Sequence, residues 1–148
     1  MDENTLKDMR GVLEQSTFPF ELVGAVVFGS RVKGKCIIHS DLDILIIADG
    51  VNPKRHRRGE AIAHIRQRLP GLPVDILLLT TQEVESNFRN HNPLFLDIAE
   101  EGIILVDKDK RVENMTEKTR QYIKKRGIKK LDDGWVFPVV QGAVTYLS

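Results

Sequence analysis

The chain has 148 residues, of which 41% are hydrophobic and 29% are charged, a composition typical of one globular domain rather than a disordered tail. Its 22 basic and 21 acidic residues nearly cancel, and a single cysteine, Cys36, excludes an internal disulfide framework and fits a reducing compartment. The longest apolar run, 44–48, is too short to span a bilayer, and the acidic, polar start is unlike a secretory signal. We therefore expect a cytoplasmic protein.

Hydrophobic periodicity predicts alternating helices and strands, which indicates a mixed α and β domain. Leu6, Met9 and Leu13 recur at helical spacing and predict a first helix with one buried face. Runs rich in Val, Ile, Leu and Phe predict four strands, at 21–28, 42–48, 74–79 and 103–106. Further helices are expected around 62–69, from residue 80, from residue 93 to residue 102, and at 114–126.

Capping residues support three of these helices. Thr80 and Glu83 have the spacing of a capping box, in which each side chain bonds the other's backbone N–H. Asn92 followed by Pro93 is typical of an N-cap and a first helical residue, and Gly127 is a typical helix end. The last twenty residues, which include Trp135, are expected to form an irregular tail that packs back onto the domain.

Positive charge is concentrated near the C-terminus. Between Lys108 and Lys130 there are ten basic and three acidic residues, a local net charge of +7, so the rest of the chain has a net charge of −6. This segment is either a solvated helix face or a docking surface for an acidic partner or RNA. A second basic run, 54–58, is interpreted as a solvated helix start or a phosphate contact.

Two aspartates open the second predicted strand. Asp41 and Asp43 are two residues apart, so both side chains point to one face of the strand, with Cα atoms roughly 6.6 Å apart. Two neighbouring carboxylates repel each other unless a cation lies between them. Hard oxygen ligands of this kind suit Mg²⁺, which also bridges to substrate phosphates.

Asp75 supplies a third carboxylate, near the start of the apolar strand 74–79. Burying an unpaired charge there would cost several kcal/mol. A metal site shared with Asp41 and Asp43 would remove this cost. The alternative is that Asp75 only caps a turn at the entrance of the strand.

A Gly-Ser pair at the end of the first predicted strand would bind phosphate. Gly29 lets the backbone approach a phosphate closely, and Ser30 offers a hydroxyl and a backbone N–H. Arg31 and Lys33 can add positive charge to a triphosphate site. The segment 29–36 also approximates the P-loop pattern, but Cys36 replaces the Ser or Thr that ligates Mg²⁺ and no long helix follows, so we reject that reading.

Together these residues resemble the nucleotidyltransferases of the DNA polymerase β superfamily, most closely the minimal (MNT) branch. That pattern is a hydrophobic residue and Gly-Ser, about ten residues, Asp-hydrophobic-Asp, and a later acid with hydrophobic neighbours. The matching residues in this sequence are Phe28, Gly29-Ser30, Asp41-Leu42-Asp43 and Val74-Asp75-Ile76.

The resemblance implies an α+β fold, a small mixed β-sheet of about four strands flanked by helices, that uses Mg²⁺, with two ions expected, and ATP. Asp41, Asp43 and Asp75 would be the catalytic and metal-binding residues, and Asp75 would help to activate the acceptor hydroxyl. The nucleotide phosphates would lie on Gly29, Ser30, Arg31 and Lys33. The reaction would transfer AMP to a hydroxyl and release pyrophosphate.

The MNT resemblance also implies a partner. Minimal members are often antitoxins paired with a helical HEPN-domain toxin, on which they adenylylate a tyrosine. We expect residues 1–107 to form the nucleotidyltransferase domain and 108–148 a basic helix and tail packed on it. Two departures from the family, Lys33 in place of a second arginine and the Cys36–His39 segment before the aspartates, affect the substrate pocket.

Two other functions remain open at this stage. The chain could be a non-catalytic subunit that neutralises its partner by occlusion, although a pure binder has no evident use for three acids. It could instead modify a small molecule such as an aminoglycoside, which would need a second pocket wall. We favour a protein partner over direct nucleic-acid binding and expect no membrane contact.

Overall fold

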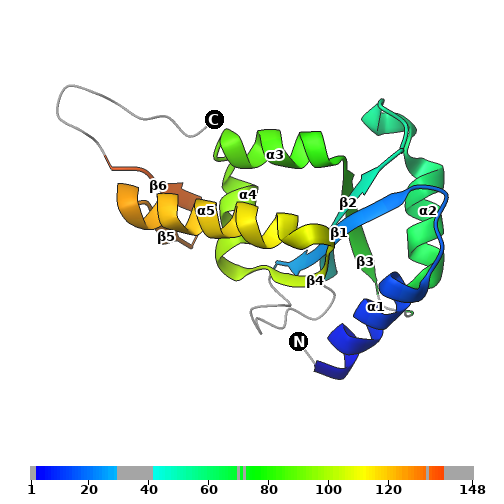
Figure 1. Cartoon of the computed structure of the whole chain (residues 1–148). Helices are drawn as coiled ribbons and strands as arrows, with labels where there is room; N and C mark the ends of the chain where they lie inside the picture. The colour runs from blue at the N-terminus through cyan, green and yellow to red at the C-terminus, as the bar shows by residue number, and fades with distance from the viewer. Residues whose placement is uncertain (1–2, 30–41, 70, 72, 133, 139–148) are drawn as a thin grey trace.

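The computed structural model describes residues 3–29, 42–69, 71, 73–132 and 134–138. Helices and strands alternate through the first two-thirds of the chain (Figure 1). The helices are α1 (Glu3–Gln15), η1 (Arg55–Arg57), α2 (Gly59–Arg68), α3 (Thr81–Arg89), α4 (Pro93–Glu101), η2 (Lys108–Lys110) and α5 (Arg111–Arg126). The strands are β1 (Glu21–Phe28), β2 (Leu42–Asp49), β3 (Val74–Leu79), β4 (Ile103–Asp107), β5 (Lys129–Leu131) and β6 (Gly134–Val136).

The first four strands form one mixed sheet in the order β3-β2-β1-β4. β1 is antiparallel to both β2 and β4, whereas β2 and β3 are parallel and are connected through α2. This arrangement confirms the predicted α+β fold class with a four-stranded sheet. The ends of the predicted strands agree with those of the structure to within one residue.

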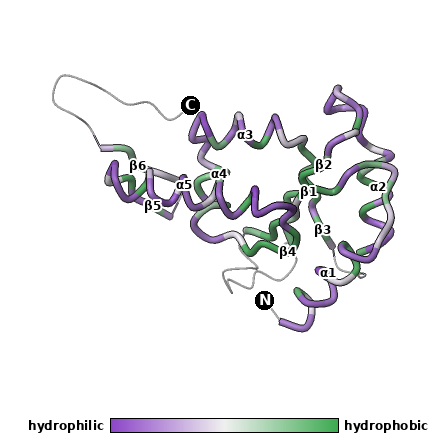
Figure 2. The backbone as a smooth tube through the Cα atoms, in the orientation of Figure 1, coloured by the Kyte–Doolittle hydropathy of each residue, from purple (hydrophilic) through white to green (hydrophobic). Residues whose placement is uncertain are grey.

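Helices cover both faces of this sheet, and its strands form the apolar centre of the molecule (Figures 1 and 2). α1 and α2 contribute Met9, Leu13 and Ile65 to the core on one face. α3 and α4 contribute Phe88 and Phe95 to the core on the other face. The central strand β2 is therefore buried on both sides over Ile44 to Ala48, which explains its nearly continuous apolar sequence.

Two predicted helix starts are confirmed by their capping contacts. Thr80 and Glu83 form the full capping box at the start of α3. Asn92 accepts a hydrogen bond from the Leu94 N–H, and Pro93 is the first residue of α4. α5 begins three residues earlier than predicted, because Asp107 at the end of β4 accepts hydrogen bonds from the N–H groups of Val112 and Glu113.

The prediction of an irregular tail after α5 is wrong for the described residues. β5 and β6 form an antiparallel hairpin, with Lys130 opposite Trp135. The Trp135 indole is buried, and its Nε1–H donates a hydrogen bond of 3.0 Å to Asp97 of α4. Lys130 forms an ion pair with the same carboxylate. The hairpin is thus attached to α4 by contacts that are remote in sequence.

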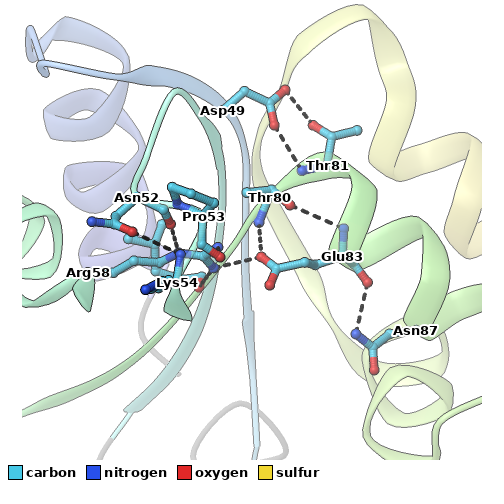
Figure 3. A network of polar contacts seen from close by, with 10 residues as sticks. Asp49, Asn52, Pro53, Lys54, Arg58, Thr80, Thr81, Glu83 and Asn87 are labelled. Carbon is cyan, nitrogen blue, oxygen red and sulfur yellow. Dashed lines mark hydrogen bonds and ion pairs between the residues drawn. The ribbon is translucent and has the colours of Figure 1, made fainter. Parts of the chain in front are cut away.

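A buried arginine, Arg58, joins the loop after the C-terminal end of β2 to β3 and α3 (Figure 3). Arg58 is 2% exposed, which corrects the reading of 54–58 as an entirely solvated run. Its guanidinium forms an ion pair of 2.6 Å with Glu83 and donates hydrogen bonds to the carbonyls of Asn52, Pro53 and Leu78. Burial acts to raise the pKa of Glu83, but the hydrogen bonds and charge of Arg58 and the Thr80 contacts lower it overall.

His91, in the turn between α3 and α4, stacks on Tyr122 of α5. The ring centroids are 3.8 Å apart, and the interplanar angle is 9°. Its φ of 53° is left-handed. Burial and the nearby charge of Arg126 lower the pKa of the imidazole below its ordinary value of 6.5. Burial and Arg126 thus both favour the neutral imidazole in the folded protein.

The His91 environment predicts a loss of stability in mild acid. Because the unfolded chain binds this proton more readily than the folded chain, the loss begins as the pH falls through about 6.5. We expect the Tm of the wild type to fall more between pH 7.5 and pH 5.5 than that of His91→Asn, since asparagine tolerates a left-handed φ. Equal decreases in the two proteins would show that other groups govern the acid response.

In the part of the chain that the structure describes, no helix is both long enough and apolar enough to cross a bilayer.

Candidate active site

Two of the predicted site carboxylates lie side by side on neighbouring strands. Asp43 is the second residue of β2 and Asp75 is the second residue of β3, and the two are paired in the parallel register. Paired residues project from the same face of a sheet, on strands about 4.8 Å apart. The structure thus brings together two acids that are separated by 31 residues in the sequence.

Gly29 places the end of β1 against the Asp43 carboxylate. Phe28 is opposite Asp43 in the antiparallel pair of β1 and β2, and Gly29 follows with a φ of +97°. A Cβ atom at this position would overlap Oδ2 of Asp43. Position 29 therefore requires glycine for two reasons: its positive φ, and the lack of space for a Cβ atom beside the Asp43 carboxylate.

Gly29→Ala should lower the nucleotidyl transfer that the sequence pattern predicts, because the new methyl group displaces Asp43, and the positive φ should also cost about 1–3 kcal/mol of stability. Gly50→Ala is the matched control, since Gly50 at the other end of β2 has a φ of +82° and open space around its Cβ position. Initial rates and urea unfolding of both variants test this. We expect Gly29→Ala and Gly50→Ala to lose similar amounts of stability, and only Gly29→Ala to lower the rate. Equal rates for the two variants would contradict the proposed role of Gly29.

The burial argument for Asp75 is wrong. β3 is an edge strand of the sheet, and Asp75 near its start is exposed. The cost of an unpaired buried charge therefore does not apply to this carboxylate. Exposure instead leaves Asp75 accessible to a ligand or substrate, so its proposed role now depends on its position beside Asp43.

Arg66 of α2 holds the start of β3. Its Nη1 donates a hydrogen bond of 2.7 Å to the carbonyl of Val74, the residue before Asp75. The contact ties an otherwise open edge of the sheet to the helix beside it. Arg66 therefore helps to fix the backbone that carries Asp75, a role that local sequence patterns do not reveal.

Asp49 shows that a carboxylate on β2 can be purely structural. It lies on the same face of the strand as Asp43 but at the opposite end, where it accepts hydrogen bonds from the backbone N–H and the hydroxyl of Thr81. These two contacts anchor the start of α3 (Figure 3). The two ends of β2 are thus chemically distinct: one is joined to a helix, and the other places Asp43 beside Gly29 and Asp75.

The other predicted site residues, namely Ser30, Arg31, Lys33 and Asp41, lie outside the described residues. Among the residues that are described, no three His, Cys, Asp or Glu side chains form a group able to hold a metal. Asp41 is not one of the described residues. The assignments to these residues stay predictions, as does the metal-binding role of Asp43 and Asp75.

Comparison with known proteins defines the class to which this fold and site belong. A family model for the nucleotidyltransferase domain matches residues 9–106, which include both β2 and β3. The chain belongs to this family and is a nucleotidyltransferase.

The similarity extends to a protein of Methanocaldococcus jannaschii that carries the name "Putative protein adenylyltransferase MJ1305". The two are 25% identical over 129 residues, which cover 84% of this chain and 88% of the relative.

Solved structures show a weaker similarity. A toxin–antitoxin structure with AMP-PNP is 18% identical and covers 82% of this chain and 92% of its own, with a TM-score of 0.45. A structure from Sulfolobus solfataricus that carries the name "putative nucleotidyltransferase" is 23% identical and covers 68% of this chain and 78% of its own, with a TM-score of 0.44. A complex of a tri-AMPylated Shewanella oneidensis HEPN toxin with an MNT antitoxin is 18% identical and covers 86% and 93%, with a TM-score of 0.43. The family assignment rests on the domain match.

Proposed function

We propose that this nucleotidyltransferase moves AMP from ATP to a tyrosine hydroxyl of a HEPN-domain toxin and acts as the antitoxin of that pair. The observation that carries the proposal is the pairing of Asp43 with Asp75 beside Gly29. The Methanocaldococcus jannaschii relative, named as a protein adenylyltransferase, supports the reaction type. The resemblance of the motif to the MNT branch supports the choice of partner.

The residues present fit a divalent cation. Asp43 and Asp75 offer hard oxygen donors from adjacent strands, and the absence of a Cβ at Gly29 leaves space next to Oδ2 of Asp43. Asp41, Asp43 and Asp75 would hold Mg²⁺. When bound, Mg²⁺ would neutralise the charge of the triphosphate.

Side chains of this protein would then bind the phosphates, orient the α-phosphorus and accept a proton. Ser30, Arg31 and Lys33 would bind the phosphates of ATP and orient the α-phosphorus. Asp75, which is exposed, would accept the proton of the acceptor hydroxyl as its oxygen attacks that phosphorus. The new bond joins the hydroxyl oxygen to the α-phosphorus, and the bond to the departing pyrophosphate breaks.

Intact-mass measurement tests this function directly. The protein encoded by the neighbouring gene, which we propose to have a HEPN domain, is incubated with this protein, ATP and Mg²⁺, and peptide mapping then locates any adduct. We expect a gain of one or more AMP units on a tyrosine. A stable complex with no mass gain would instead favour a non-catalytic binder, and AMP transfer to an aminoglycoside alone would favour a small-molecule substrate.

A further inference from the structure

A groove between α3 and α5 lies apart from the proposed catalytic residues. It has a volume of about 510 Å³, and its lining residues include none of Gly29, Asp43 and Asp75. The two helices that form it belong to the layer on one face of the sheet (Figure 1). The docking groove is defined here by four of its lining residues, Phe88, Met115, Lys118 and Tyr122.

The floor of the docking groove is apolar and its rim is charged. Phe88 is buried, and Met115 and Tyr122 are half-buried, so an apolar side chain from a partner could pack against all three. Lys118 and Arg89 are exposed at the rim, together with one acid, Glu85. The groove therefore combines an apolar contact with an excess of positive charge.

The arrangement of Tyr122 argues against a nucleobase as the occupant. His91 stacks on one face of the ring, and the Arg126 guanidinium lies over the ring at 5.5 Å from the centroid. The imidazole occupies one face of the ring. That face is not available for stacking a base, which is the usual way in which proteins hold single-stranded RNA.

The positive charge beside the groove is not neutralised within the described residues. Lys108, Arg120 and Lys130 form ion pairs with acids of this chain. In contrast, Lys118 and Lys125 are exposed, and neither forms an ion pair with any residue that the structure describes. Since Met115, Lys118, Tyr122 and Lys125 recur every three or four residues, they share one face of α5.

The geometry points to the docking groove as the binding surface for a partner protein whose contacting segment has an apolar anchor flanked by Asp or Glu. The anchor packs on Phe88 and Met115, and the acids face Lys118 and Lys125. Charge complementarity supports this occupant, since rim charges set specificity and association rate. The inference rests on the proposed function only for the partner's identity, which is the HEPN-domain protein.

Charge reversal with a matched control tests the docking groove. Lys125→Glu reverses a charge on the groove face, whereas Lys124→Glu makes the same change one position away, on the side of the helix with Glu117 and Arg120. Both lysines are exposed in the last turn of α5, so the two variants should lose a similar, small amount of stability, about 0.3–1 kcal/mol, and thermal unfolding checks this. The dissociation constant for the HEPN-domain protein is measured by titration calorimetry at two salt concentrations.

We expect Lys125→Glu to weaken binding about tenfold and Lys118→Glu with Lys125→Glu to weaken it further, with little change for Lys124→Glu. The effect should shrink at high salt. Equal affinities for Lys125→Glu and Lys124→Glu, no complex at all, or binding of an RNA oligonucleotide in place of the protein would each overturn the inference. If the two proteins bind and binding depends on Lys125, but no AMP is transferred, the proposed enzyme activity is refuted and the assignment of the docking groove is not.

Discussion

Asp43→Asn is expected to lower the rate of nucleotidyl transfer by about a hundred- to a thousandfold while the fold is retained. The substitution keeps the size of the side chain and removes its negative charge. The proposed cation site would then lose a carboxylate whose position is set by the pairing with Asp75 and by the close approach of Gly29. Single-turnover rates with saturating ATP and Mg²⁺ measure the effect, because they separate chemistry from product release.

Asp49→Asn is the matched control for this experiment. It makes the same chemical change on the same strand and the same face, but Asp49 holds Thr81 at the other end of β2. We expect Asp49→Asn to lower the free energy of unfolding by about 1 kcal/mol and to leave the transfer rate near that of the wild type. If both variants lost activity to the same extent, the loss would reflect a general disturbance of β2, and the site assignment to Asp43 would fail.

Arg58→Met is expected to have the largest effect on stability, a decrease in the free energy of unfolding of about 3–5 kcal/mol. The Arg58 side chain is 1% exposed, and it bonds the Glu83 carboxylate as well as three backbone carbonyls. Methionine fills part of the same space but donates no hydrogen bond. Glu83 and the carbonyls of Asn52 and Leu78 would be left with fewer partners.

Urea unfolding of Arg58→Met and of its neighbour Arg57→Met measures this effect. Arg57 is exposed in η1, so its replacement should change the free energy of unfolding by no more than about 0.5 kcal/mol. A small effect of Arg58→Met would mean that water replaces the guanidinium. In that case the Arg58 contacts in Figure 3 would not be what holds residues 52–58 to β3 and α3.

Local patterns were sufficient for most of the fold and for part of the site. The four strands of the main sheet were predicted to within one residue, and the caps at Thr80 and Asn92 were confirmed. A cap forms between a side chain and a backbone group only two or three residues away, so its pattern can be read from the sequence. The Gly-Ser and Asp-x-Asp spacing likewise predicted the family, because all of these residues lie between positions 29 and 43 of the sequence.

What the sequence alone determined was thus the four strands of the main sheet, the caps at Thr80 and Asn92, and the family. The tertiary structure decided the rest: β3 is an edge strand that exposes Asp75, Arg58 is buried, Asp107 starts α5, and Asp97 anchors the hairpin through Trp135. The position of a strand in the sheet depends on pairing across the whole domain and leaves no local trace in its residues. The Trp135 contact joins residues 38 positions apart. Contacts of this kind form only when the sheet and its helices are assembled, and for this reason the docking groove between α3 and α5 could not be foreseen.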